Sequence, residues 1–191
     1  MNGLPKSLRN DIRRFGFEQS EAGLFIPRAN VMVGGVFEYE HWRAGKVISV
    51  LHSHNLVTNE GLNHILDAVL HGTAAIATWY VGLFEGNYNP VATDTAATFV
   101  ANATESTAYD EATRQAYVEA AASSQVTTNS ASKATFTMNA TKTIYGAFLS
   151  SVTTKSATTG VLLAADKAGT AKAVVDDDQL FVTYALTLTA S

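Results

Sequence analysis

The segment GGVFEYEHWRAGKVISVL, residues 34–51, indicates the fold of this chain. Its first half alternates, with Phe37, Tyr39 and His41 on one side and Glu38, Glu40 and Trp42 on the other. A period of two is the spacing of a half-buried β-strand. Residues 47–51 form a second run rich in β-branched side chains, and Gly45 between the runs is typical of a short turn with a bulge. We therefore expect a β-hairpin.

Further strand patterns follow along the chain. The segment DQLFVTYALTLT (178–189) alternates, and Leu180, Val182, Tyr184, Leu186 and Leu188 are expected to face inward while Thr183, Thr187 and Thr189 face outward. TWYVGLF (78–84), KATFTM (133–138), TIYGAFL (143–149) and GVLLAA (160–165) are also short strand candidates. Strands do not alternate with helices as in a parallel nucleotide-binding sheet. We predict a mainly β chain, with an antiparallel β-sandwich or jelly-roll-like domain over residues 34–191.

The period changes in HSHNLVTNEGLNHILDAVLHG, residues 52–72. An apolar face with helical spacing consists of Leu62, Ile65, Leu66, Val69 and Leu70. Thr58 or Asn59 is a good N-cap, and His71–Gly72 is a plausible stop. We expect one packed helix, which covers an end or a face of the sandwich.

The same segment holds four of the five histidines, namely His52, His54, His64 and His71. His52 and His54 would project from one side of a strand, which is a workable spacing for metal ligands, and Asp67 could assist. No HExxH motif accompanies them. The alternative is that these imidazoles flank a strand-to-helix corner and form hydrogen bonds or subunit contacts. We favour this alternative and expect no metal and no cofactor.

Residues 86–132 are rich in Ala, Thr, Ser and Asn and have weak periodicity. Two interpretations remain open for this region. It consists either of long loops and edge strands or of loops around a short helix between Tyr109 and Ala121.

Residues 1–33 differ from the rest and are expected to form an N-terminal arm with a short helix. Ser7 can cap this helix, and Leu8, Ile12 and Phe15 would share one of its faces. Lys6, Arg9, Arg13 and Arg14 supply positive charge on the other faces. This basic side is either simply solvated or docks onto an acidic neighbouring subunit. We favour docking, with the candidate assembly contacts Lys6, Leu8, Arg9, Ile12, Arg13, Arg14 and Phe15.

Composition argues against several classes of function. The chain of 191 residues is 47% hydrophobic, carries a net charge of −4 and contains no cysteine. The acidic balance favours no nucleic-acid partner, and thiolate catalysis and Cys-based metal sites are excluded. No signal peptide is apparent, and no apolar run approaches the roughly 20 residues that span a bilayer, so we expect no membrane partner.

No catalytic constellation stands out either, and we expect a protein that is not an enzyme. The acidic run Asp176–Asp178 is interpreted as a solvated turn, because the spacing of a calcium loop is missing. Glu105, Asp110 and Glu111 could form an acid/base pair, but acids in such a loop are more often exposed. No GxSxG motif is present. The aromatic residues Trp42, Trp79, Tyr80 and Tyr88 could line a sugar site, although core or subunit contacts are commoner.

Several ordered segments together resemble a family of small virion proteins of tailed bacteriophages. They are NLVTNEGLNHILDAVLHG (55–72), TWYVGLFEGNYNPVATDTAATF (78–99), STAYDEATRQAYVEAAASSQ (106–125), KATFTMNATKTIYGAFL (133–149) and LFVTYALTL (180–188). The resemblance covers roughly residues 45–190, and residues 1–40 lie outside it. It implies a non-enzymatic structural subunit present in many copies and carries no catalytic motif.

Within that family context, we expect a capsid decoration, or cement, protein that binds the major capsid protein and stabilises the outer shell. Such a protein would be made in the host cytoplasm, reside on the virion and form a homo-oligomer, a trimer by analogy. Two alternatives are a neck or tail component, such as a collar, adaptor or fibre-anchoring subunit, and a receptor- or glycan-binding tail module. The last would use Trp42, Tyr80, Tyr88 and loops 86–130.

Overall fold

A computed structural model describes residues 17–19, 25–27 and 31–190 of the chain. The chain divides into two compact units, Val33–Thr187 and a smaller unit that combines Met1–Met32 with Leu188–Ser191. In the smaller unit, β1 (Phe17–Gln19) pairs antiparallel with β2 (Phe25–Pro27). The helix expected near residues 7–15 lies outside the described residues.

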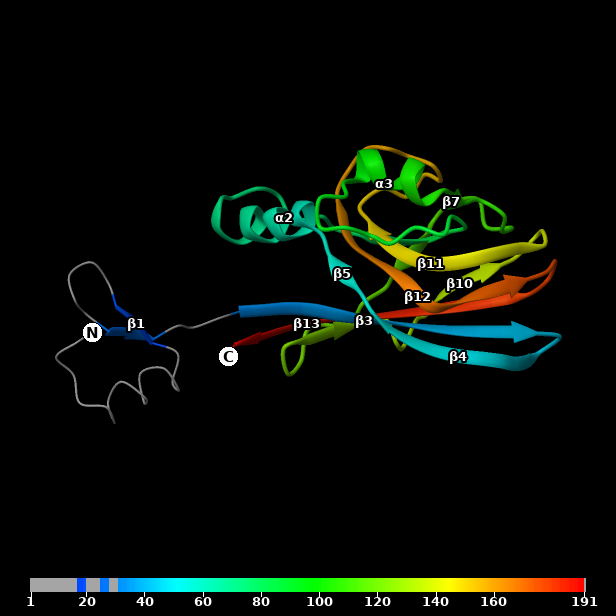
Figure 1. Ribbon diagram of the computed structural model, residues 1–191, viewed down its shortest axis with the longest axis horizontal. Helices are drawn as coiled ribbons and strands as arrows, with labels where there is room; N and C mark the ends of the chain where they lie inside the picture. Colours follow the sequence, from blue (N-terminus) through cyan, green and yellow to red (C-terminus); the bar gives the residue numbers. More distant parts are fainter. Residues whose placement is uncertain (1–16, 20–24, 28–30, 191) are drawn as a thin grey trace. The chain divides into compact units, whose positions relative to one another are not determined.

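The first large sheet contains the predicted hairpin. Its path is β10-β13-β3-β4, and β9 also pairs with β13. Its strands are β3 (Val31–Arg43), β4 (Lys46–His54), β9 (Val126–Thr128), β10 (Ala134–Thr137) and β13 (Gln179–Ala190). Figure 1 shows the long β3 and β13 side by side, with β4 at the edge.

The second large sheet follows the path β5-β12-β11-β6-β7, with β8 paired to β6. Its strands are β5 (Leu56–Val57), β6 (Trp79–Phe84), β7 (Glu105–Ser106), β8 (Gln115–Tyr117), β11 (Lys142–Ser150) and β12 (Leu162–Val174). The strands of both sheets pair antiparallel, and the neighbouring β3 and β13 run in opposite directions (Figure 1). The strand candidate TIYGAFL forms most of β11, which is a central strand because it lies between β12 and β6.

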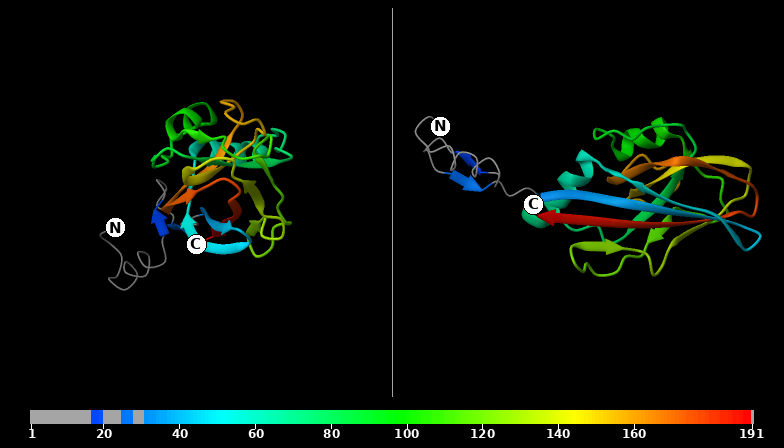
Figure 2. Two further views of the ribbon diagram at one scale, coloured as in Figure 1. Left: turned by 90° about the vertical axis from the view of Figure 1, so that its right-hand side faces the viewer. Right: turned by 60° about the horizontal axis from the view of Figure 1, so that its bottom comes forward.

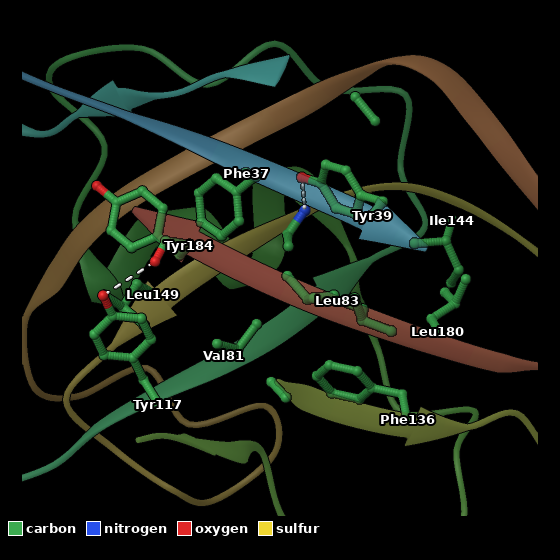
Figure 3. Packing of buried hydrophobic residues seen from close by; sticks show 14 of the residues in the cluster. Phe37, Tyr39, Val81, Leu83, Tyr117, Phe136, Ile144, Leu149, Leu180 and Tyr184 are labelled. Carbon is green, nitrogen blue, oxygen red and sulfur yellow. Dashed lines mark hydrogen bonds between the residues drawn. The ribbon is translucent and has the colours of Figure 1, made fainter. Parts of the chain in front are cut away.

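The two sheets pack face to face, which confirms the predicted antiparallel β-sandwich (Figures 1 and 2). Aromatic rings from β3 and β13 meet in the core, where the centroids of Phe37 and Tyr184 are 4.4 Å apart (Figure 3). Val81 and Leu149 of the opposite sheet belong to the same cluster. The alternation predicted for β13 holds for its buried apolar side chains, but Thr183 is buried as well.

The predicted β3–β4 hairpin is present, and its turn has two residues, Ala44 and Gly45. Ala44 and Gly45 both have positive φ, 47° and 72°. Positive φ at both central residues defines the type I′ turn, whose twist matches that of paired strands. The register shifts between His41 and Trp42, so the irregularity lies within the strands and not at Gly45, where the bulge was expected.

The described part of the sandwich contains two helices, where the sequence predicted one packed helix. The expected helix is α2 (Asn59–Leu70), and its N-cap is Thr58. The second, α3 (Ala96–Ala103), lies over the outer side of the β6–β11 sheet, where Phe99 packs against Phe84 and Phe148. The alternative helix within 109–121 is wrong, since that segment contains β8. α3 has a single large aromatic residue, so no apolar stripe marks it in the sequence.

None of the helices in the described part of the chain is long and apolar enough to cross a membrane.

Candidate assembly surface

The first turn of α2 is pressed against β12 by small residues. The Thr58 hydroxyl donates a hydrogen bond to the Leu162 carbonyl (2.5 Å) and accepts one from the Gly61 N–H (3.0 Å). A Cβ atom on Gly61 would lie 2.6 Å from the Leu163 carbonyl oxygen. Only glycine permits so close an approach of helix and strand.

The Glu60 carboxylate fixes the same end of α2. Its Oε2 atom accepts hydrogen bonds from the N–H groups of Ala96 (2.9 Å) and Leu162 (2.7 Å). One side chain therefore connects the start of α2, the start of α3 and the start of β12. These contacts fix the orientation of α2 relative to β12, and they therefore determine which side of the helix remains exposed.

The C-terminal half of α2 leaves large aliphatic side chains in solvent. The exposed fractions are 56% for Leu66, 74% for Val69 and 79% for Leu70. Ile65 packs against the core, and Gly61 is the buried residue of the helix. The apolar face predicted as one packed surface is thus wider than the side that the core covers. We call Leu62, Leu66, Val69 and Leu70 the α2 stripe.

An apolar cavity of about 180 Å³ lies near α2. Trp79 lines it, and this indole also meets the His64 imidazole edge-on at 5.7 Å between ring centroids. Tyr117 and Tyr184 form part of its wall, and the Tyr117 hydroxyl donates to the Tyr184 carbonyl (3.2 Å). Burial raises the pKa of Tyr117 to about 12.

A second group of exposed aliphatic residues lies on β4. Val47, Ile48 and Val50 are each about half exposed. Across the ladder, Val50 pairs with Glu40, whose carboxylate forms an ion pair with Lys133. Both cationic and anionic side chains therefore lie beside the apolar residues of this strand. The charged residues of α2, by contrast, are only acidic, because the helix contains no lysine or arginine.

Most of the strongest polar interactions are internal to the sandwich. The Arg114 side chain is fully buried, and its Nε and Nη2 atoms donate to the two oxygens of Glu105 at 2.8 and 2.7 Å. The expectation that Glu105 is an exposed loop acid is therefore wrong. Glu111 accepts from the Thr137 N–H (3.0 Å), and only Asp110 of the proposed acid/base group is exposed.

The acidic run between β12 and β13 is a turn, as predicted, but only two of its residues are exposed. Asp178 is buried and binds His41 (2.8 Å) and Arg43 (2.7 Å) of the neighbouring hairpin. The guanidinium of Arg43 holds the pKa of the Asp178 carboxyl well below its usual range. This carboxylate joins two hairpins at one end of the sandwich. Asp176 and Asp177 line an open cleft of about 340 Å³ there, beside Trp42.

A third carboxylate lies between the sheets. Asp166 of β12 accepts hydrogen bonds from the hydroxyls of Tyr39 and Ser53, both at 2.8 Å. Burial raises the pKa of the Asp166 carboxyl, and the two donors oppose that effect. Both oxygens have a partner, so this group crosslinks β12 with the β3–β4 hairpin.

The histidines do not converge. His52 is exposed on β4 with its Nδ1 atom 3.5 Å from Glu38, His64 contacts Trp79, and His71 is the C-cap of α2. Within the described ranges, no group of three His, Cys, Asp or Glu residues is arranged to hold a metal ion.

The aromatic residues considered for a sugar site have separate partners. Trp42 meets Phe181 edge-on at 5.8 Å, while Trp79 lines the apolar cavity. The Tyr88 hydroxyl donates to Asp94 (2.9 Å) near α3. The expected assembly residues of the arm, by contrast, all lie outside the described residues: Lys6, Leu8, Arg9, Ile12, Arg13, Arg14 and Phe15.

The chain matches no protein-family model and no curated protein sequence. The candidate functional surface therefore rests on its geometry. Hydrophobic spacing identified the members of the α2 stripe but did not show that they stay exposed. The one residue of the sequence that could have indicated the buried side is Gly61, which lies where α2 approaches β12.

Proposed function

We propose that this chain is a non-enzymatic structural subunit of a tailed-bacteriophage virion, and that it acts as a capsid decoration protein. It binds the outer shell in many copies and stabilises it by bridging neighbouring capsid subunits. The resemblance of residues 45–190 to small phage virion proteins supplies this context.

The observation that carries the proposal is the α2 stripe. Isolated exposed aliphatic residues are normal on a protein surface, but a contiguous apolar patch marks an interaction site. Leu66, Val69 and Leu70 lie within five consecutive residues of one helix and are more than half exposed. The helix is anchored through Thr58 and Glu60, so it presents these side chains on a rigid support.

The polar groups of the sandwich also support a structural role. The carboxylates of Glu105, Asp166 and Asp178 are bound by internal donors. Such networks join strands and loops, as a subunit under mechanical load requires.

The test is to add the purified protein to phage particles assembled without it and to locate the added density by cryo-electron microscopy. We expect regularly spaced density over the shell. Density confined to the tail vertex would refute the decoration role in favour of a neck or tail component. No added density, with folded protein in excess, would refute the assignment to the virion.

A further inference from the structure

We propose that the α2 stripe receives residues 4–15 from the arm of a second copy of this chain. The inference rests on the proposed function, because it names a partner for the surface that carries that function. We commit to a second copy since a decoration protein places many copies of the chain on one particle.

The two segments have the same apolar spacing. Leu62, Leu66 and Val69 of the stripe follow one another at intervals of four and three residues. Leu8, Ile12 and Phe15 of the arm repeat these intervals. Helices whose apolar residues recur every three to four positions pack ridge into groove along such stripes. An arm with the helix that its spacing predicts would therefore match the stripe from Leu62 to Val69.

The charges are complementary as well. Residues 1–30 contain five Lys and Arg and three Asp and Glu, which gives a net charge of +2. The whole chain has a net charge of −4, so residues 31–191 carry −6. On the arm, Arg9 and Arg13 directly follow Leu8 and Ile12. On α2, the exposed Asp67 directly follows Leu66. Opposite charges therefore flank the two apolar stripes in the same way.

The exposed face of β4 is the competing receptor, and its charges disfavour it. The carboxylates opposite β4, Glu38 and Glu40, already have a cationic partner in Lys133. The exposed Lys46 lies beside Val47. A basic arm would meet like charges there, which opposes docking. α2 has no lysine or arginine in Asn59–Leu70.

Charge reversal in the full chain tests the pairing. The two variants are Arg9→Glu/Arg13→Glu on the arm and Asp67→Arg on α2, and self-association is measured by sedimentation velocity. We expect each variant alone to associate roughly tenfold more weakly than the wild type, because it places like charges opposite each other. An equimolar mixture of the two should regain association, since the acidic arm of one meets the basic helix of the other.

Asp176→Arg is the matched control, because it reverses an exposed aspartate in the β12–β13 turn, at the other end of the sandwich from α2 (Figure 1). It should associate like the wild type. An arginine near the C-terminal end of α2 interacts favourably with the helix dipole, so Asp67→Arg should remain folded.

Three outcomes would overturn the inference: a monomeric wild type at high concentration, unchanged association of Asp67→Arg, or a mixture no better than its components. A mixture no better than its components would also be observed if each arm docked onto the α2 stripe of its own chain. Particle binding is scored separately. A monomeric protein that still decorates shells would refute only the arm exchange. A protein whose arm docks onto α2 of a second copy but which binds no particle would refute only the proposed function.

Discussion

The buried Arg114 side chain connects several segments of this molecule. Besides Glu105, its guanidinium donates to the carbonyl oxygens of Val152 (2.9 Å) and Ala157 (3.1 Å), and it lies 5.0 Å from the centroid of the Phe148 ring. It therefore orders the loop between β11 and β12. In the sequence, TRQ resembles any exposed turn, so this buried pair could not be predicted. Glu105 lies only nine residues before Arg114, but the carbonyl partners Val152 and Ala157 lie 38 and 43 residues after it.

We expect Arg114→Met to lower the free energy of unfolding by about 3–5 kcal/mol, because it leaves the Glu105 carboxylate buried without its cation. Lys142→Met, which removes the partly exposed ion pair with Glu85, should cost less than about 1 kcal/mol. Urea denaturation of both variants measures the difference. Equal losses in the two variants would contradict the structural role of Arg114.

Ala44 is another residue whose environment gives a prediction. It has a φ of 47°, a region that glycine and asparagine tolerate better than alanine. Ala44→Asn creates the Asn-Gly pair favoured in type I′ turns, and we expect it to stabilise the protein by up to about 1 kcal/mol.

The measurement is again urea denaturation. Ala131→Asn is the control, because Ala131 lies in an exposed turn and is not among the residues with positive φ. An equal gain in both variants would show that asparagine, and not the turn geometry, causes the effect.

At the scale of the element, α2 separates what a sequence pattern can show from what it cannot. Helical spacing predicted its range, and the N-cap is Thr58, one of the two residues predicted for it. The buried side was not predictable, because the apolar arc spans more of the helix than β12 can cover. Gly61 determines which side of α2 faces the core, because only a residue without a side chain lets the helix come this close to the Leu163 backbone.

Gly61→Ala tests this account of α2. Alanine favours an isolated helix by about 1 kcal/mol over glycine, yet its Cβ would meet the Leu163 backbone. We expect a net loss of about 1–3 kcal/mol in the free energy of unfolding, as for overpacked sites. Gly169→Ala is the control, since a Cβ there meets nothing within 4 Å. A Gly61→Ala variant as stable as the wild type would contradict the close packing of helix and strand.

The two hairpins joined by Asp178 give a pH-dependent prediction. A carboxyl whose pKa is lower in the folded protein than in the unfolded chain stabilises the fold above the unfolded value of about 4. That contribution is lost as the pH falls. The stability difference between the wild type and Asp178→Asn should therefore shrink from about pH 5 towards about pH 2.

Denaturation at several pH values measures this difference. Asp176→Asn changes an exposed carboxylate in the same turn and serves as the control. A difference for Asp178→Asn that stays constant with pH would show that its ionised carboxylate does not stabilise the joint.

At the scale of the whole molecule, strand alternation was sufficient to predict the sandwich. Alternating residues such as Phe37 and Tyr39 mark a half-buried strand wherever it pairs. The order of the strands could not be predicted, since pairings such as β13 with β3 join opposite ends of the chain. α3 was missed because Ala96–Ala103 buries small residues and one Phe instead of an apolar stripe.

The candidate surface was predictable only in part. The sequence singled out the residues of the α2 stripe but assigned them to the core. It also singled out the basic arm, whose docking remains a prediction. The combination of an apolar helix end and an oppositely charged arm emerges only when the burial of each α2 residue is known.

The central claim is that the α2 stripe is an assembly surface of a virion subunit. The most direct measurement compares particle incorporation of two folded variants, each with three exposed aliphatic residues replaced by serine. One is Leu66→Ser/Val69→Ser/Leu70→Ser on α2, and the other is Val47→Ser/Ile48→Ser/Val50→Ser on β4. We predict that particles retain the β4 variant at wild-type occupancy and lose the α2 variant. Retention of the α2 variant at wild-type occupancy would contradict the account.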